Sequence, residues 1–157
     1  MNSEPTRILL AEDHHVSRHL LERSLTNWGF QVLAVEDGEA ALMIMEGDDP
    51  PPLAILDWTM PKMDGLEVCR RVRARLGRPY TYLLLLTARG HRDEITTALE
   101  AGVDDYVIKP YEQDELKGRL KVGRRVVGLE RRLAAQEIEL QAAREELARI
   151  RSVPLGS

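Results

Sequence analysis

The chain has 157 residues, of which 43% are hydrophobic and 31% are charged, and its formal net charge is −4. This length can bury one proper core with residues to spare, and the charge lacks the basic signature of a nucleic-acid-binding domain. The single Cys69 excludes an intramolecular disulfide and suits a reducing compartment. No apolar run approaches the roughly 18 residues of a membrane span, and the first residues hold no signal-peptide core. We therefore expect a cytoplasmic protein that binds neither nucleic acid nor membrane.

Short apolar segments alternate with helical patterns up to about residue 118. The expected strands are residues 7–11, 31–35, 53–56, 82–86 and 105–108. Residues 8–11, 53–56 and 83–86 are continuously apolar, which is typical of parallel strands that are covered on both faces. Apolar residues at helical spacing separate the strands, as in Val16, Leu20, Leu21 and Leu25. The alternation predicts an α/β fold with a doubly wound, five-stranded parallel sheet and right-handed crossovers.

Polar residues follow four of the expected strands directly. They are Glu12 and Asp13 after the first strand, Asp57 after the third, Thr87 after the fourth and Lys109 after the fifth. Ligands of open α/β sheets bind beyond the carboxyl ends of the strands, so we expect these side chains to share one site. Taken singly, each has an ordinary explanation, because an acid pair suits a helix N-terminus and a lysine suits a surface turn. Carboxylates, a hydroxyl and an ammonium at four strand ends together favour one shared site over these separate explanations.

Three carboxylates in one pocket repel one another and therefore favour a divalent cation. Oxygen ligands suit Mg²⁺, which keeps several waters and often bridges to a phosphate. With the charge neutralised, Asp57 is placed to attack a phosphoryl group as a carboxylate nucleophile. A phosphatase of the haloacid dehalogenase type would carry a second Asp two residues later, where this chain has Thr59. His15 and His19 share a helix face, but no further ligand at suitable spacing completes a metal site there.

Residues 6–118 resemble the receiver domain of two-component response regulators, similar to the chemotaxis receiver protein. The resemblance is carried by Leu10-Ala11-Glu12-Asp13, Leu56-Asp57-Trp58-Thr59-Met60-Pro61-Lys62-Met63-Asp64-Gly65, Leu86-Thr87-Ala88, Gly102-Val103-Asp104-Asp105-Tyr106 and Lys109-Pro110. It implies a flavodoxin-like sheet of strand order 2-1-3-4-5. It also implies that a cognate histidine kinase or phosphotransfer protein delivers a phosphoryl group to Asp57.

The resemblance implies a role for each site residue. Mg²⁺ would bind Asp13, Asp57 and the backbone carbonyl of Thr59, with Glu12 assisting through water. Glu12 departs from the family pattern, because an Asp is commoner at that position.

The remaining roles concern the phosphoryl group itself. Lys109 would hold it, next to a peptide before Pro110 that is usually cis in the family. Thr87 and Tyr106 would be the switch pair, in which the hydroxyl moves to the phosphate and the ring swings inward. Thr59 and Arg89 occupy variable positions that tune the phosphoryl lifetime in this family.

From about Val122 the pattern changes to one long helix. Residues at 3–4 spacing are Val126, Leu129, Leu133, Gln136, Leu140, Ala143, Leu147 and Ile150, which is the a/d seam of a coiled coil. The flanking g and e residues of successive heptads are opposite in sign: Arg125/Glu130, Arg132/Glu137, Glu139/Arg144 and Glu146/Arg151. This pattern predicts a homodimer through residues 122–151, with a parallel arrangement favoured. An antiparallel pairing and a helix packed on its own domain remain alternatives, and Gly118, Gly123 and Gly128 mark a possible hinge.

We therefore expect three parts: a receiver at residues 1–121, a coiled-coil signalling helix at 122–151 and a flexible tail at 152–157. The expected function is a phosphorylated receiver that signals through homodimerisation and is not a stand-alone enzyme. Two alternatives stay open. The chain could be the N-terminal regulatory part of a longer regulator such as a diguanylate cyclase, or a constitutive coiled-coil module with a vestigial receiver.

Overall fold

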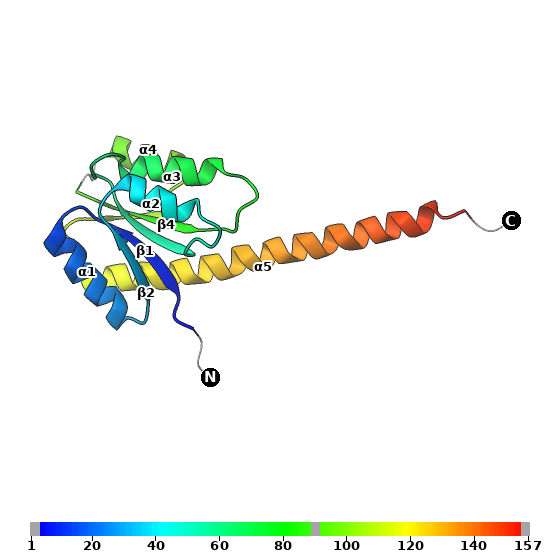
Figure 1. The fold of residues 1–157 in the computed structure, drawn as a ribbon, viewed down its shortest axis with the longest axis horizontal. Coiled ribbons are helices and arrows are strands. Elements are labelled where there is room, and N and C mark those ends of the chain that lie inside the picture. Colours follow the sequence, from blue (N-terminus) through cyan, green and yellow to red (C-terminus); the bar gives the residue numbers. More distant parts are fainter. Residues whose placement is uncertain (1–3, 89–91, 155–157) are drawn as a thin grey trace.

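The computed structural model describes residues 4–88 and 92–154, and within them five strands alternate with five helices (Figure 1). In chain order they are β1 Arg7–Ala11, α1 His15–Asn27, β2 Gln31–Val35, α2 Gly38–Met45, β3 Leu53–Asp57, α3 Gly65–Ala74, β4 Tyr82–Thr87, α4 Arg92–Glu100, β5 Asp105–Ile108 and α5 Gln113–Ser152. All five expected strands are confirmed, and β3 and β4 each extend one residue further than expected, to Asp57 and Thr87.

The strands form one parallel sheet of order β2-β1-β3-β4-β5, as the resemblance implied. The strands β3 and β4 are buried along their whole length, and β1 is buried after Arg7. The edge strands β2 and β5 are partly exposed. The continuously apolar segments are therefore the three central strands, as expected for strands that are covered on both faces.

Two cores lie on opposite faces of the sheet because successive strand side chains point to opposite sides. One core packs Leu9 of β1 against Ala41 of α2 and Val68 of α3. The other packs Leu10 of β1 against helices α1 and α5, in part through Leu116. Figure 1 shows the corresponding layers, with α2, α3 and α4 on one side of the sheet and α1 and α5 on the other. The sheet with helices α1–α4 is called the α/β domain below.

Helix α5 is a single helix of 40 residues whose first turns pack on the α/β domain. Its buried residues are Leu116, Leu120, Gly123 and Val127. A Cβ atom at Gly123 would lie 2.7 Å from the ring of Tyr82, so glycine allows the helix to approach the sheet closely here. The helix runs unbroken through Gly118 and Gly128 as well.

Beyond Val127 every described residue of α5 is exposed, although Arg131 still donates to the backbone carbonyl of Tyr80 at 3.3 Å, and Figure 1 shows the helix continuing well past the sheet. The residues of the expected a/d seam are exposed there; Leu129 is 56% exposed and Leu140 is 52% exposed. The helix includes Ser152, the first residue of the expected flexible tail, and residues 155–157 of that tail lie outside the described residues. None of the described helices combines the length and apolar character that crossing a bilayer would demand.

Candidate functional site

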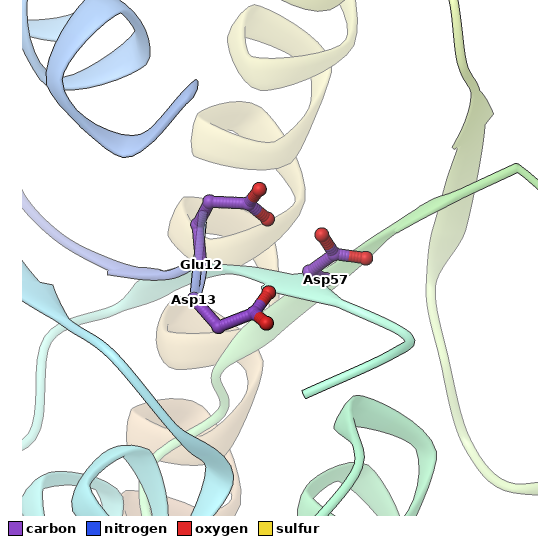
Figure 2. A group of neighbouring side chains, drawn as sticks. All are labelled: Glu12, Asp13 and Asp57. Carbon is purple, nitrogen blue, oxygen red and sulfur yellow. The ribbon is translucent and has the colours of Figure 1, made fainter. Parts of the chain in front are cut away.

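Three acidic side chains meet at the carboxyl edge of the sheet. The strand β1 ends at Ala11, directly before Glu12 and Asp13, and its neighbour β3 ends at Asp57. Ala11 pairs with Leu56, so the two strand ends are level. One carboxylate oxygen from each acid lies within 4.8 Å of the other two, and Figure 2 shows the three side chains side by side. The acids that the sequence placed in one site are therefore together.

The three acids differ in their contact with solvent. Glu12 is 2% exposed and Asp57 is 7% exposed, whereas Asp13 is exposed. Burial, together with the hydrogen bond and the negative charge of Asp57, raises the pKa of Glu12 to about 8. Among the described residues, Glu12 Oε2 finds no hydrogen-bond partner. A buried oxygen without a hydrogen bond is costly, so the donor set fits a small hard cation such as Mg²⁺.

Lys109 supplies a positive charge to this edge. Its Nζ atom donates a hydrogen bond of 2.7 Å to Asp57 Oδ2 and lies 3.6 Å from Glu12 Oε2. Burial alone would lower the pKa of Lys109, but the hydrogen bond and charge of Asp57 raise it above its ordinary value. The peptide between Lys109 and Pro110 is cis.

The loop after Asp57 is fixed by backbone contacts. The amide of Thr59 donates to Asp57 Oδ1 at 3.3 Å, and the amide of Gly65 donates to the carbonyl of Trp58 at 2.9 Å. A Cβ atom at Gly65 would collide with the carbonyl oxygen of Asp57, so only glycine lets α3 begin this close to the end of β3. Thr59 itself is exposed beside the site.

The expected switch residues lie on the two strands beyond β3. Thr87 is the last residue of β4 and is 2% exposed, and its Cα partner on β5 is Ile108. Tyr106 lies on β5 opposite Leu85 and is half-buried against the core that contains α2 and α3. Arg89, which was expected to tune the phosphoryl lifetime, lies outside the described residues. The roles of Thr87 and Tyr106 stay predictions.

Arg18 belongs to the site, although nothing in the sequence singled it out. From the first turn of α1, its guanidinium donates to the carbonyl of Glu12 at 3.0 Å and to that of Asp13 at 3.4 Å. It also forms an ion pair with Glu36 at 3.4 Å. Arg18 therefore holds the backbone of the acid pair against α1. A lone arginine on the polar face of a helix carries no sequence signal for such a role.

Residues 8–121 match the family model of the response regulator receiver domain. The chain belongs to the response regulator receiver family. It is 44% identical over 135 residues to the transcriptional regulatory protein TctD of Salmonella typhimurium, a match that covers 86% of this chain and 56% of that relative. It is 38% identical over 121 residues to the probable transcriptional regulator ycf27 of Porphyra purpurea, covering 77% of this chain and 48% of that relative. This receiver chain thus spans about half the length of the curated relatives it matches.

Solved receiver structures share the fold. The receiver domain of a sensor histidine kinase from Pseudomonas aeruginosa PAO1 is 29% identical with a TM-score of 0.68, and the match covers 79% of this chain and 98% of that one. That structure carries a magnesium ion coordinated in its active site cleft. A CheY-like receiver from Methanospirillum hungatei JF-1 has a TM-score of 0.73 at 23% identity, covering 80% of this chain and 98% of that one. The second likeness concerns the fold alone.

Proposed function

We propose that this receiver accepts a phosphoryl group on Asp57 from a histidine kinase or phosphotransfer protein. The proposal rests on the environment of the Asp57 carboxylate. One of its oxygens accepts from Lys109 at 2.7 Å, the other accepts from the amide of Thr59 at 3.3 Å, and two further carboxylates lie beside it. Such an environment keeps the nucleophile oriented and supplies cationic and amide donors for incoming phosphoryl oxygens.

The donor set also supports a resident Mg²⁺, which Asp13, Asp57 and the Thr59 carbonyl would hold, with Glu12 assisting through water. When bound, the ion supplies positive charge that lets an anionic phosphoryl group approach a carboxylate. The buried Glu12 oxygen without a hydrogen bond and the exposed side chain of Asp13 fit a site that opens to solvent. The magnesium ion in the active site cleft of the Pseudomonas aeruginosa receiver domain supports this cofactor.

In the phosphoryl transfer, an Asp57 oxygen attacks the phosphorus of a phosphohistidine. The new O–P bond forms as the P–N bond breaks, and the imidazole nitrogen leaves with the bonding electron pair. Lys109 then donates to a phosphoryl oxygen, and the Thr87 hydroxyl moves to donate to another. Tyr106 follows into the space that Thr87 vacates. The only reactions that we propose for this chain are the gain and loss of this phosphoryl group, so we do not propose that it is a stand-alone enzyme.

We further propose that α5 reports the phosphorylation state by pairing with α5 of a second copy. Successive helix residues are turned by about 100°, so the seam residues Leu129, Leu133 and Leu140 face roughly away from Val127, which packs on the receiver. A parallel pair along this seam places the two receivers on opposite outer sides of the coil. The two receivers then communicate through α5 itself rather than through a direct contact.

A contact between β5 and α5 supports this route. Arg119 of α5 donates to both carboxylate oxygens of Asp105, at 3.0 and 2.8 Å, and Asp105 also accepts from the amide of Tyr106 at 2.9 Å. The residue before the switch tyrosine is therefore tied to the helix that carries the seam. A movement of Tyr106 changes the position of Asp105 and, through Arg119, the first turns of α5.

The alternative places this receiver at the N-terminal end of a longer regulator, of the diguanylate cyclase type or another type. The match to only about half of each curated relative supports such an arrangement. The same phosphoryl chemistry and the same helix would then control an attached output domain.

The test of the proposed chemistry is incubation with acetyl phosphate and Mg²⁺, followed by intact-protein mass spectrometry. The wild type is expected to gain the mass of one phosphoryl group, and Asp57→Asn none. Asp48→Asn is the matched control, because Asp48 lies on an exposed loop and its substitution is expected to leave the gain unchanged. Equal phosphorylation of Asp57→Asn and wild type would overturn the proposal.

A further inference from the structure

Arg18 joins three segments of the chain at the carboxyl edge of the sheet. Its Nη1 atom donates to the carbonyl oxygens of Glu12 and Asp13, in the turn after β1. Its Nη2 atom donates to His15 Nδ1 at 3.2 Å, in the first turn of α1, and to Glu36 Oε1 at 3.4 Å, just after β2. The side chain is only 13% exposed. Arginine carries its N–H donors in a fixed planar fork, so one side chain can hold several segments at one point.

The ion pair with Glu36 does not explain this placement. The Glu36 carboxylate is 75% exposed, and such an ion pair contributes little because water screens it and both side chains lose freedom. The shortest contact of the guanidinium is instead the one with the Glu12 carbonyl, at 3.0 Å, and the same nitrogen also reaches the Asp13 carbonyl at 3.4 Å. What Arg18 holds is therefore chiefly the backbone of residues 12 and 13.

That backbone lies between two regular elements. The strand β1 ends at Ala11 and His14 is the N-cap of α1, so the carbonyls of Glu12 and Asp13 precede the hydrogen bonds of the helix. A carbonyl oxygen fixes the plane of the peptide to which it belongs. Arg18 contacts the peptide on each side of the Asp13 Cα atom, so the two contacts together restrain both backbone dihedrals of Asp13.

This restraint matters because Glu12 and Asp13 carry two of the three clustered carboxylates. Figure 2 shows their side chains extending from adjacent backbone positions toward Asp57. The Asp13 side chain is exposed, so its position depends mainly on the backbone that carries it. Mg²⁺ demands a near-ideal geometry of its oxygen ligands, and ligands that are already in place lose less freedom when the ion binds.

We propose that Arg18 is a positioning residue for the divalent cation, because it holds the backbone of Glu12 and Asp13 so that their carboxylates lie in place beside Asp57. The inference rests on the proposed Mg²⁺ site and goes further, since it assigns part of the cation affinity to a residue outside the acid cluster. Arg18 acts through backbone carbonyls rather than through the carboxylates. Removing a residue that orients metal ligands typically costs roughly 10–100-fold in metal affinity, and we expect about tenfold here.

The sign of the effect separates positioning from charge repulsion. The positive charge of Arg18 by itself disfavours a cation nearby, so repulsion alone predicts that removing the charge tightens Mg²⁺ binding. Positioning predicts weaker binding when the guanidinium is lost. Arg18→Lys keeps the charge without the planar fork. Repulsion predicts no change for the lysine variant, whereas positioning predicts a loss of affinity that is smaller than for Arg18→Met.

The first experiment titrates Mg²⁺ into the full chain without a phosphoryl donor and follows binding by isothermal titration calorimetry. Arg18→Met, which keeps an unbranched apolar stem, is expected to raise the Kd for Mg²⁺ about tenfold. Arg23→Met makes the same change of charge at an exposed position of α1 and is expected to leave the Kd unchanged. Equal or tighter binding by Arg18→Met overturns the positioning role. A wild type that takes up no Mg²⁺ overturns the proposed metal site itself, so the two failures are distinguishable.

The second experiment measures phosphorylation by acetyl phosphate over a range of Mg²⁺ concentrations. Arg18→Met is expected to need about ten times more Mg²⁺ for half of its maximal rate and to approach the wild-type rate as Mg²⁺ saturates. Leu21→Val, a small change in the core beneath α1, is expected to keep the Mg²⁺ requirement of the wild type. An equal shift in Leu21→Val would indicate a general loosening of α1 and contradict the proposal. A lower saturating rate of Arg18→Met with an unchanged Mg²⁺ requirement would also contradict it.

Discussion

The Lys109 ammonium is shared by two buried carboxylates, since it lies 2.7 Å from Asp57 Oδ2 and 3.6 Å from Glu12 Oε2. The protein therefore balances part of the negative charge at this carboxyl edge of the sheet with its own cation. A proton on Glu12 or a bound metal ion would neutralise the remaining negative charge. This arrangement makes the stability of the chain sensitive to Lys109, to pH and to Mg²⁺.

Lys109→Met is expected to lower the free energy of unfolding by about 2 kcal/mol at neutral pH without Mg²⁺. The reason is that Asp57 stays buried while its charged partner is lost. The effect is smaller than for a deeply buried pair, because the Lys109 side chain is 32% exposed. Urea denaturation measures the change, and added Mg²⁺ is expected to reduce it. Lys117→Met, on an exposed position of α5, is the control; equal effects of the two substitutions would contradict the account.

The raised pKa of Glu12 predicts a pH-dependent stability. Its pKa is about 8 in the folded chain against an ordinary value of 4.5, so between these values the folded state binds more protons than the unfolded state. The contribution of Glu12 is therefore fully present below pH 4.5 and is lost as the pH rises through 8. In chelator-treated protein, the stability of the wild type relative to Glu12→Gln is expected to fall across this window. If the difference in unfolding free energy between the wild type and Glu12→Gln stayed constant or rose with pH, Glu12 would be ionised in the folded state.

Binding of Mg²⁺ is expected to release protons near neutral pH. Because the cation favours ionised carboxylates, it displaces the proton that burial keeps on Glu12. The affinity for Mg²⁺ should rise between pH 6 and about 8 and then level off. Isothermal titration calorimetry in buffers of different ionisation enthalpy measures the protons released. Glu12→Gln should bind Mg²⁺ without this release, and an equal release by that variant would assign the proton to another group.

Gly123→Ala is expected to destabilise the chain by about 1–3 kcal/mol, the usual cost of overpacking a well-packed contact. The added methyl group would lie 2.7 Å from the ring of Tyr82, so α5 or the ring must shift. Gly128→Ala is the matched control, because its added Cβ meets no atom of the described chain within 4 Å. The control should instead stabilise the exposed helix by roughly 1 kcal/mol. Thermal or urea unfolding measures the stability of both variants. An equal gain in stability for Gly123→Ala and Gly128→Ala would exclude the close packing of α5 on Tyr82.

Much of the fold and of the acid cluster could be predicted because both depend on local patterns. Continuously apolar strands such as residues 83–86 specify a central parallel strand, and each parallel strand delivers the residue that follows it to the same edge. Asp57 and Lys109 could therefore be brought together although 52 positions separate them in the chain.

Other features depend on contacts that no local pattern encodes. The long helix begins at Gln113 rather than near Val122, because its first turns gain stability from packing Leu116 and Leu120 on the sheet. The role of Arg18 requires the three-dimensional neighbourhood of α1 and the end of β1. Ile138 is not among the expected seam residues, and only the position of the α3–β4 loop shows that it lines a groove.

The central claim is that phosphorylation of Asp57 changes how two chains associate through α5. The most direct test is analytical ultracentrifugation of the full chain with and without beryllofluoride and Mg²⁺. The account predicts that the association constant of the wild type changes with beryllofluoride while that of Asp57→Asn does not. A wild type that associates equally tightly in both conditions would contradict the claim and indicate a constitutive coiled-coil module.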